Sequence, residues 1–299
     1  MYAAIVTGAS GQDGSYLCEL LTEKGYHLHR FVGDVTSYQN VLENIQGFRD
    51  HERIEIYNLA AKVHDKSPYD TLHVNTTGIL NIMEVVKNLG MQSRCRIFQA
   101  SSSEIFANHW ESPQTEFTHR APRNVYGISK VTADSLVDNY RRNHDLYVSS
   151  GILYNHESPR RKDIYVTQKI VKGLQSGECF KIGNLECRRD WGHAKDYVNA
   201  MWLILQQDTP DSYIIATGKT HSVREFIEMV VDKMNKTITW LGEGKNKVGI
   251  IDDKVAIEVS EEFYRPEHTI LVGNPSKLEA IGWKREYDLN GIVEEMLKN

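Results

Sequence analysis

The sequence predicts an α/β fold in which a doubly wound parallel sheet is followed by a smaller mixed α/β lobe. Three observations predict it. Short apolar runs alternate with helical patterns over the first half of the chain, a glycine-rich turn joins the first run to the first helical pattern, and later runs end in small or polar residues. This alternation is typical of a parallel sheet with helices on both faces.

The composition narrows the class of protein. The 299 residues carry a formal net charge of -5 with no long run of one sign, which gives no electrostatic reason to expect nucleic acid as a partner. No apolar run is long enough to cross a bilayer, so we expect no membrane partner. The four cysteines form no Cys-x-x-Cys pair, which indicates neither a metal site nor a disulfide framework. Strand-like sequence from Tyr2 leaves no room for a signal peptide, so we expect a cytoplasmic protein, in the host cytoplasm if the source is a virus.

The first strand is expected at residues 2–7, an apolar run of the kind that is buried on both faces. Glycines follow it at Gly-x-x-Gly-x-x-Gly spacing, and a helical pattern begins directly after them. Such glycines permit a tight turn and let the backbone approach a pyrophosphate, whose charge the helix N-terminus stabilises. We expect this loop to bind a dinucleotide cofactor through Gly8, Ser10, Gly11, Gln12, Asp13 and Gly14.

Residues 27–34 are expected to form the second strand, which ends in Asp34. A carboxylate about 20 residues past the glycines binds the ribose hydroxyls of NAD, whereas NADP calls for a nearby arginine. Arg30 is the local arginine, and it lies inside the expected strand rather than beyond its tip. Position alone therefore does not decide between the two cofactors.

Three further strands are expected at residues 53–61, 96–100 and 147–154, with helices at 41–48 and 76–89 between them. The first of these strands runs into Leu59, Ala60 and Ala61, small or apolar residues that suit close approach to a cofactor. The second delivers residues 101–104 to its carboxyl end, where open parallel sheets place their chemistry.

Tyr126 and Lys130 stand four positions apart and share one face of an expected helix. A lysine ammonium there can lie against the cofactor ribose, and we expect its charge to lower the pKa of Tyr126 from about 10 towards working pH. Such a tyrosine can take a proton from a substrate hydroxyl while hydride leaves the same carbon. An ordinary helix surface is the alternative, because Tyr-x-x-x-Lys occurs by chance in many helices.

The second half predicts helices at residues 164–173, 194–206 and 223–234, a strand at 213–216 and a loop at 242–253. We expect a dinucleotide-binding domain at residues 1–154. Residues 155–299 are expected to form mainly a substrate-binding lobe, with elements that return to the first domain.

Longer motifs stand at residues 7–16, 101–104, 155–161, 189–197, 215–226 and 264–266. Together with Tyr126 and Lys130 they resemble the GDP-mannose 4,6-dehydratase family of extended short-chain dehydrogenases/reductases, over nearly the whole chain. The resemblance implies that Ser102, Tyr126 and Lys130 serve oxidation at C4 of the sugar and that Glu104 takes the C5 proton. A plain dehydrogenase or epimerase of this fold has no use for a carboxylate beside the serine, so Glu104 discriminates between these reactions.

The resemblance also implies a substrate, GDP-mannose, and a cofactor, NADP. Arg189 and Arg265 resemble the pair that neutralises the substrate diphosphate, for which arginine is suited by its bidentate hydrogen bonds. Other implied contacts to sugar, phosphate or guanine are Asn155, Val166, Lys169 and Asp196. Further implied cofactor positions are Asp34, Val35, His156, Arg161 and His64, of which His64 is equally compatible with a packed histidine.

Two departures from the family pattern are visible. Ser102 stands where the family has threonine, which keeps the hydroxyl. The larger departure is a deletion, in which residues 30–37 join the start of the second strand to the end of the third. The missing segment carries the arginines that grip the NADP 2′-phosphate and a loop that helps to build tetramers. NAD therefore stays an alternative cofactor, and we expect a homodimer rather than a tetramer.

Two other functions remain open at this point. One is a different sugar-nucleotide epimerase or reductase on the same fold. The other is an inactive cofactor-binding scaffold, against which the presence of Ser102, Glu104, Tyr126 and Lys130 argues.

Overall fold

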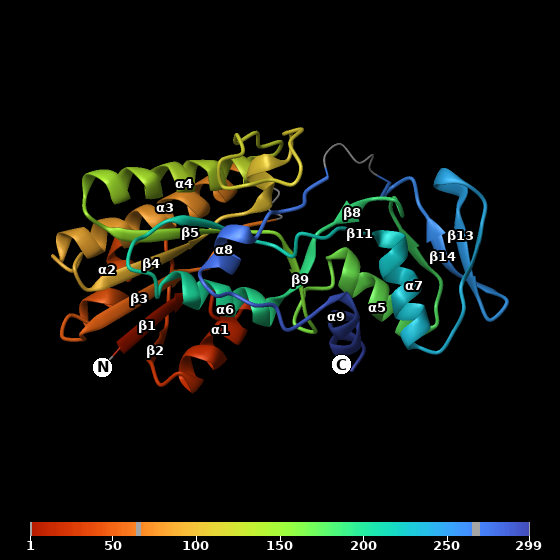
Figure 1. Ribbon diagram of the computed structural model, residues 1–299, viewed down its shortest axis with the longest axis horizontal. Helices are drawn as coiled ribbons and strands as arrows, with labels where there is room; N and C mark the ends of the chain where they lie inside the picture. Colours follow the sequence, from red (N-terminus) through yellow and green to blue (C-terminus); the bar gives the residue numbers. More distant parts are fainter. Residues whose placement is uncertain (1, 64–66, 265–269, 299) are drawn as a thin grey trace.

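The fold is described by a computed structural model that covers residues 2–63, 67–264 and 270–298. Its centre is a six-stranded parallel sheet with the order β10-β5-β4-β3-β1-β2, which confirms the expected fold class (Figure 1). The strands are β1 (Tyr2–Thr7), β2 (His27–Arg30), β3 (Arg53–Asn58), β4 (Cys95–Ala100), β5 (Tyr147–Leu153) and β10 (Ser212–Ile215).

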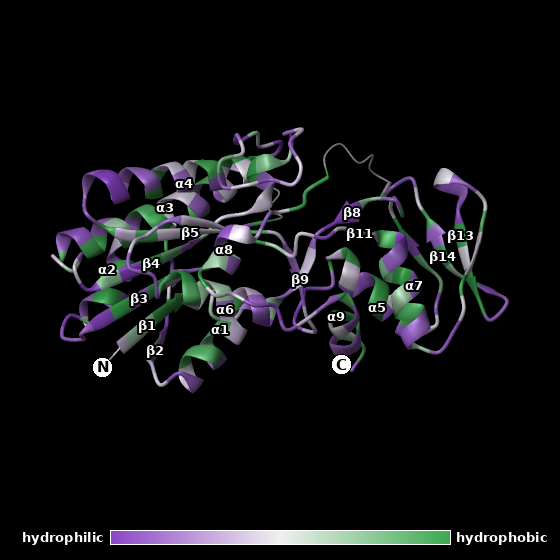
Figure 2. Ribbon diagram, viewed as in Figure 1, coloured by the Kyte–Doolittle hydropathy of each residue, from purple (hydrophilic) through white to green (hydrophobic). Residues whose placement is uncertain are grey.

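Helices cover both faces of this sheet, and alternate residues of each strand pack against opposite layers. In β1, Ala4 and Val6 belong to the core cluster shared with α1 (Gln12–Glu23) and α6 (Ala194–Ile204). Ile5 belongs to the cluster on the other face, with α2 (Tyr38–Gln46), α3 (Pro68–Asn88) and α4 (Val125–Asn143). Figure 2 shows hydrophobic residues where these helices meet the strands. Burial on both faces explains why the strands are apolar runs rather than alternating patterns.

The sheet ends at β2, where a doubly wound sheet of order 3-2-1-4-5-6 carries one more strand. The chain passes from β2 directly to α2, which agrees with the predicted deletion. The prediction that the strand continues to Asp34 is wrong, because β2 ends at Arg30. Beyond it, the Asn44 side-chain amide both donates to and accepts from the backbone of Val32, at 2.9 and 3.0 Å. Side chains of α2 thus form hydrogen bonds with backbone groups that would otherwise pair with a further strand. Such bonds leave fewer unpaired backbone groups at the edge of the sheet.

Two other sequence predictions need correction. The third helix starts at Pro68 rather than at residue 76, because Ser67 caps it by accepting a hydrogen bond from the Asp70 backbone N–H and proline suits the first helical position. Residues 242–253, expected to be a loop, contain η2 (Gly244–Asn246) and β13 (Val248–Ile251). Asp252 and Asp253 both have positive φ, as a tight hairpin turn between β13 and β14 (Lys254–Val259) demands.

The second lobe packs α5 (Val166–Ser176), α7 (Val223–Lys233) and α9 (Leu289–Leu297) around a separate core cluster. Its sheet has the order β12-β13-β14-β7, with β12 (Thr239–Leu241) and β7 (Phe180–Ile182) at the ends. Two short pairs complete the chain path, β6 (Asn155–Glu157) with β9 (Trp191–His193) and β8 (Arg188–Arg189) with β11 (His221–Ser222). Three elements from the second half of the sequence return to the first domain. The strand β10 belongs to its sheet, and residues of α6 and of α8 (Ser276–Ala280) belong to the core cluster on one face of that sheet.

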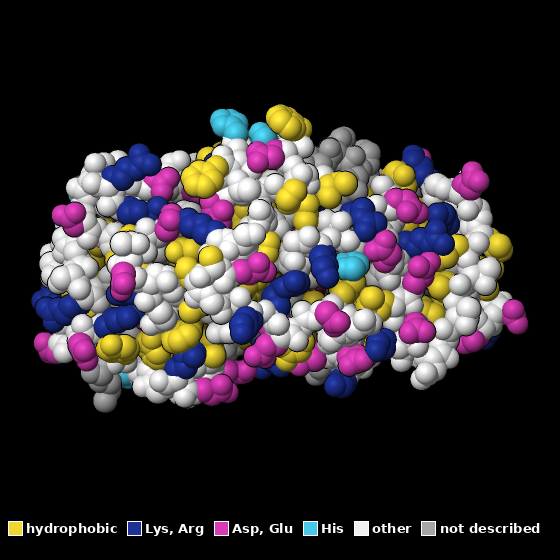
Figure 3. Space-filling view, viewed as in Figure 1, with side chains coloured by type: hydrophobic (Ala, Val, Ile, Leu, Met, Phe, Trp, Pro, Cys, Tyr) yellow, Lys and Arg dark blue, Asp and Glu magenta, His cyan; other side chains and the backbone are white. Residues whose placement is uncertain are grey.

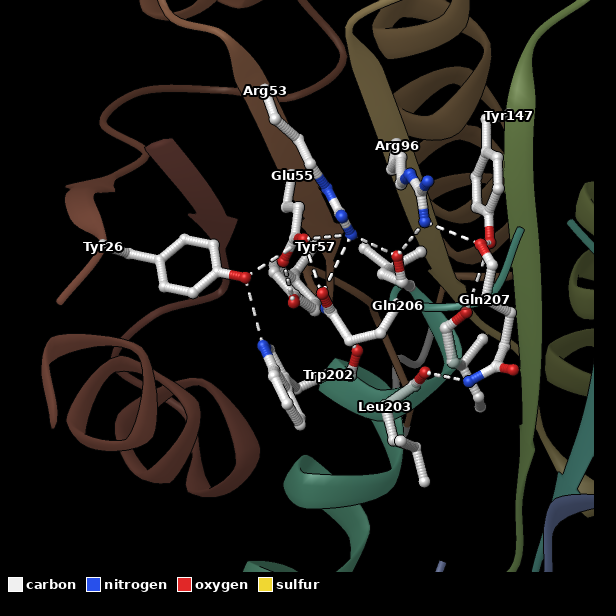
Figure 4. A network of polar contacts seen from close by, with 12 residues as sticks. Tyr26, Arg53, Glu55, Tyr57, Arg96, Tyr147, Trp202, Leu203, Gln206 and Gln207 are labelled. Atoms are coloured by element: carbon white, nitrogen blue, oxygen red, sulfur yellow. Dashed lines mark hydrogen bonds and ion pairs between the residues drawn. The ribbon is translucent and has the colours of Figure 1, made fainter. Parts of the chain in front are cut away.

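A polar network fixes the C-terminal end of α6 to the sheet (Figure 4). Arg96 of β4 donates to the carbonyl oxygens of Leu205 and Gln207 at 2.7 and 2.6 Å. Arg53 of β3 also donates to the Leu205 oxygen, and the Tyr147 hydroxyl of β5 donates to the Gln207 oxygen at 2.6 Å. Three neighbouring strands thus satisfy carbonyl groups at the end of a helix, where cationic side chains are favoured.

The surface carries no strong charge segregation on the face seen in Figure 3, where basic and acidic side chains are interspersed. In the part of the chain that the structure describes, no helix combines the length and the apolar composition needed to cross a membrane.

Candidate active site

Two neighbouring cavities lie at the carboxyl ends of the central strands. One of about 390 Å³ is lined by the glycine loop after β1 and by Arg161, Lys162, Ile164 and Tyr165. The other, of about 600 Å³, is lined by residues that follow β4 and β5 and by the first turns of α4. They adjoin, because both are lined by Asp13, Leu59, Ala61, Val63, Arg161 and Tyr165.

The glycine loop fits a dinucleotide phosphate group. Gly8 has φ +64°, and a Cβ there would lie 3.0 Å from the Ala60 backbone nitrogen. A Cβ on Gly14 would lie 2.2 Å from the Gly8 carbonyl oxygen, so no side chain is tolerated at this position. Helix α1 begins directly after Gly11 without a side-chain cap, and Gln12 and Asp13 of its first turn line the smaller cavity. An uncapped helix N-terminus beside a glycine turn is suited to bind a pyrophosphate.

Asp13 ties this loop to the strand β6. The Nε2 atom of His156 lies 2.9 Å from both carboxylate oxygens of Asp13, and its Nδ1 atom lies 2.7 Å from the Tyr154 carbonyl oxygen. Burial opposes ionisation of Asp13, but the charges of His156 and Arg161 outweigh it and hold the pKa of Asp13 below its usual value. The loop is therefore fixed to the segment that carries two predicted cofactor residues, His156 and Arg161.

Tyr126 and Lys130 lie in the first turns of α4, whose N-terminus is capped by Asn124 through a 2.8 Å bond from the Gly127 backbone N–H. Lys130 is buried, and its ammonium group donates to the Ala100 carbonyl oxygen at 2.8 Å. The Lys130 nitrogen lies 5.6 Å from the centre of the Tyr126 ring. Burial lowers the pKa of Lys130 to about 8, although the charge of Asp134 opposes this shift.

The expectation that the pKa of Tyr126 falls is wrong for the protein as the structure describes it. Burial raises the pKa of Tyr126 above its usual value, and the charge of Glu104 adds to this effect. A hydrogen bond with Ser102 and the charge of Arg161 lower the pKa but do not offset burial. Burial dominates because desolvation penalises the charged form of a phenol.

Glu104 lies beside these groups, in the short helix η1 (Ser103–Phe106) that follows β4. One of its carboxylate oxygens accepts a hydrogen bond from the Asn124 side-chain amide at 2.8 Å, and its backbone N–H donates to the Ser102 hydroxyl at 3.3 Å. The larger cavity is lined by all four predicted catalytic residues, Ser102, Glu104, Tyr126 and Lys130. A Cβ on Gly127 would lie 2.7 Å from the Glu104 carbonyl oxygen, so glycine permits η1 and α4 to approach this closely.

The other predicted contacts divide into two groups. The cavities are also lined by the predicted residues Gly8, Gly11, Gln12, Asp13, Gly14, Leu59, Ala61, Asn155, His156 and Arg161. Neither lining includes Ser10, Asp34, Val35, Ala60, Val166, Lys169, Arg189 or Asp196. His64 and Arg265 lie outside the described residues.

Several residues of the second group have partners elsewhere in the fold. Asp34 is exposed and accepts a 2.8 Å bond from the Thr36 backbone N–H, which lowers the pKa of its carboxyl group. Lys169 lies 4.0 Å from the centre of the Phe263 ring, and Arg189 donates to the Arg188 carbonyl oxygen at 2.6 Å. The predicted ligand roles of Asp34, Lys169 and Arg189 stay predictions.

Asp196 is bound to the backbone of a segment near the C-terminus. Its carboxylate accepts hydrogen bonds from two backbone N–H groups, those of Glu286 and Tyr287, at 3.0 and 3.1 Å. Burial raises the pKa of Asp196 to about 6 despite these bonds. This carboxylate thus holds the segment before α9, and its predicted contact to the substrate stays a prediction.

Sequence reasoning missed Tyr165 and Asn124. Tyr165 lines both cavities, and the Arg161 guanidinium lies 3.6 Å from the centre of its ring. Asn124 both caps α4 and binds Glu104. The cap has a sequence signal, since asparagine precedes the helix by one residue, whereas nothing near Tyr165 in the sequence marks it as a cavity residue.

The doubly wound sheet, the glycine loop and the Ser102–Tyr126–Lys130 set around one cavity define an extended short-chain dehydrogenase/reductase, with an additional carboxylate at Glu104. The family profile described as GDP-mannose 4,6 dehydratase matches residues 5–54 and 33–296. The chain therefore belongs to the GDP-mannose 4,6-dehydratase family.

Individual relatives from distant organisms support the same family assignment. The chain is 40% identical to the GDP-mannose 4,6 dehydratase of Homo sapiens over 334 residues, which covers 98% of this chain and 90% of that protein. It is 36% identical to the GDP-mannose 4,6-dehydratase of Vibrio cholerae, with 98% and 92% covered. Because the alignment with the human protein has 334 positions and this chain has 299 residues, at least 35 aligned positions have no residue here. This difference in length agrees with the deletion inferred at the sheet edge.

Solved structures show the same fold at low sequence identity. A UDP-glucose 4-epimerase from Thermotoga maritima with UDP-glucose superposes with a TM-score of 0.84 at 17% identity, covering 100% of this chain and 98% of that chain. A dTDP-glucose 4,6-dehydratase from Bacillus anthracis in complex with NAD gives a TM-score of 0.82 at 18% identity, covering 100% and 96%. The protein RMD from Pseudomonas aeruginosa complexed with NADPH gives 0.79 at 20% identity, covering 99% and 98%.

Proposed function

We propose that the chain is a hydro-lyase that converts GDP-mannose to GDP-4-dehydro-6-deoxy-D-mannose. Membership of the GDP-mannose 4,6-dehydratase family supports this substrate. The single observation that carries the reaction type is the position of Glu104, which lines one cavity with Ser102, Tyr126 and Lys130. Elimination of water needs a base for a carbon-bound proton in addition to the groups that oxidise an alcohol.

A nicotinamide dinucleotide is the cofactor that the glycine loop fits, and we assign NADP, with NAD as the alternative. Relatives of this fold with the printed ligands NADPH and NAD support the class of cofactor. When bound, the nicotinamide group supplies reversible hydride acceptance. The chain would hold the cofactor through the glycine loop, Leu59, Ala61, His156 and Arg161.

In the first step Tyr126, in its ionised form, takes the proton of the C4 hydroxyl group. Ser102 holds the same oxygen, so two side chains that already share a hydrogen bond converge on it. Loss of this proton, together with transfer of a hydride from C4, converts the alcohol to a ketone. Lys130 is fixed by the Ala100 carbonyl oxygen, with its ammonium nitrogen 5.6 Å from the centre of the Tyr126 ring, and would contact the cofactor ribose.

The ketone makes the C5 proton acidic, and Glu104 removes it. Water then leaves from C6, with Glu104 or Tyr126 donating the proton that the departing hydroxyl group needs. Return of the hydride to C6, with the second of the two protons held by Glu104 and Tyr126 going back to C5, would complete an internal redox loop with no net oxidation. Glu104 is suited to this role because its carboxylate is held by Asn124 at the edge of the cavity.

We further propose a cytoplasmic homodimer, in the host cytoplasm if the source is a virus. The segment that helps to build tetramers in the resembled family is the one that this chain lacks at the edge of its sheet. Light scattering of the purified protein tests this assignment, and a tetrameric mass contradicts it.

Mass spectrometry of the purified protein and of its reaction with GDP-mannose tests the function. We expect a product lighter by one water, together with NADP released from the denatured protein. A product of unchanged mass indicates an epimerase, and absence of product, with or without bound nucleotide, indicates an inactive scaffold. Either result overturns the dehydratase assignment.

A further inference from the structure

Arg161 lies where the two cavities meet, and two other side chains hold its guanidinium group. The guanidinium carbon lies 3.6 Å from the centre of the Tyr165 ring, within the range of a cation–π contact. Its Nε atom lies 3.2 Å from a carboxylate oxygen of Glu157. These two contacts therefore restrict where the guanidinium group can lie.

The support for this arrangement is itself buried. Glu157 of β6 is 1% exposed, and the same carboxylate oxygen accepts a 2.6 Å bond from the Thr167 hydroxyl group in the first turn of α5. Tyr165 is the N-cap residue of α5. The strand β6 and the start of α5 thus hold Arg161 from two sides, at the wall of the cavity that contains Tyr126.

Two other cations line this cavity, Arg123 and Lys130, and of these Lys130 is less suited to be a permanent charge. Its ammonium group is engaged with the Ala100 carbonyl oxygen, and burial lowers its pKa to about 8. Burial therefore makes Lys130 easier to neutralise than an arginine, which keeps its charge at any assay pH.

We propose that Arg161 stabilises the ionised phenol of Tyr126 during proton abstraction, and that Glu157 and Tyr165 are positioning residues that hold Arg161 for this task. The proposal deepens the function proposed above and rests on it for the identity of the substrate. It adds an electrostatic role to a residue assigned until now to the cofactor alone.

The charges that act on Tyr126 agree with this role. Burial raises the pKa of Tyr126, and Tyr165 and Glu104 act in the same direction. The Ser102 hydrogen bond and the Arg161 charge act in the opposite direction, so Arg161 provides cationic stabilisation of the phenolate. The same guanidinium also acts to lower the pKa of Asp13, which lines both cavities.

The direct test replaces Tyr126 in the full chain by 3,5-difluorotyrosine, whose phenol is more acidic, and titrates it by fluorine NMR. We expect Arg161→Met to raise the pKa of this group by about one unit, the lower end of the effect of a nearby opposite charge. Tyr165→Leu removes the stacked ring but keeps the charge, and we expect a smaller rise. Tyr165→Phe keeps the ring but loses the phenol that raises the pKa of Tyr126, so it is the reference for Tyr165→Leu. Exposed Lys172→Met removes a charge from α5 away from the cavities, and it should titrate as the parent does.

The pH profile of kcat with GDP-mannose gives the second measurement. Its acidic limb should move to higher pH in Arg161→Met and Tyr165→Leu, with partial rescue by Arg161→Lys. The proposal is overturned if folded Arg161→Met titrates as the parent does, or, should that variant not fold, if Tyr165→Leu titrates as Tyr165→Phe does. A parent protein that yields no dehydrated product refutes the proposed function instead, because the fluorine titration does not depend on turnover.

Discussion

Glu104→Gln is the substitution that separates a dehydratase from a simple dehydrogenase on this fold. The change removes the proposed base but keeps an oxygen that can accept the 2.8 Å hydrogen bond from Asn124. Glu104 forms hydrogen bonds with Asn124 and Ser102, whereas the glycine loop is held by the contact between Asp13 and His156. We therefore expect the fold and cofactor binding to survive.

The expected loss of turnover is at least about 100-fold, since general base catalysis contributes about two to four powers of ten. This corresponds to at least about 2.7 kcal/mol of transition-state stabilisation. The loss should fall on the elimination, so oxidation at C4 should still occur. Reduced cofactor should therefore accumulate in the variant when GDP-mannose is added.

The assay combines three measurements on Glu104→Gln: turnover of GDP-mannose, absorbance of the reduced nicotinamide, and affinity for NADPH. Glu43→Gln is the matched control, because Glu43 is exposed on α2 and lines neither cavity. Turnover within tenfold of the parent in Glu104→Gln, with cofactor bound, would refute the assigned role of this carboxylate.

Three further predictions concern the frame around the site. Arg53→Met leaves the fully buried Glu55 carboxylate without the cation that lies 2.6 Å away, and should lower the free energy of unfolding, measured in urea, by about 3 kcal/mol. The control Lys236→Met, which breaks an exposed ion pair, should lower it by less than about 1 kcal/mol. Equal losses in the two variants would contradict the argument. Gly14→Ala should weaken NADPH binding at least about tenfold because its Cβ would lie 2.2 Å from a carbonyl oxygen, whereas Gly47→Ala, with nothing within 4 Å, should bind as the parent does. Burial lowers the pKa of His193 to about 4, although the charge of Glu295 opposes this shift. The unfolded chain therefore binds the proton more tightly, and the free energy of unfolding should fall by up to about 3 kcal/mol as the pH drops from 6.5 to 4. His193→Gln should flatten this pH dependence, and an unchanged slope in urea melts at several pH values would disprove the argument.

The glycine loop and the residues after β4 could be predicted from the sequence, because their positions depend on neighbouring residues in the chain. Glycine spacing directly after an apolar run determines a turn that no other residue tolerates, as the 2.2 Å approach at Gly14 shows. Ser102 and Glu104 follow a strand of a parallel sheet, so the chain direction alone sends them to the edge where Tyr126 also lies.

Other features could not be derived, because they depend on contacts between distant segments. The strand expected to reach Asp34 ends at Arg30, since the side chains of α2 bind the following backbone in place of strand pairing. The hairpin within residues 242–253 was missed because two aspartates with positive φ make its turn, without the glycine that usually signals one.

The sequence by itself predicted the sheet class, the glycine loop and the four residues that line the larger cavity. Only the tertiary structure decided the electrostatics of Tyr126, which burial reverses from the direction that Lys130 alone would give. It also decided that Arg161, held by Glu157 and Tyr165, faces that cavity. The physical reason is that spacing fixes which side chains share a strand end or a helix face, whereas desolvation and the distance between charges arise only when separate segments pack together.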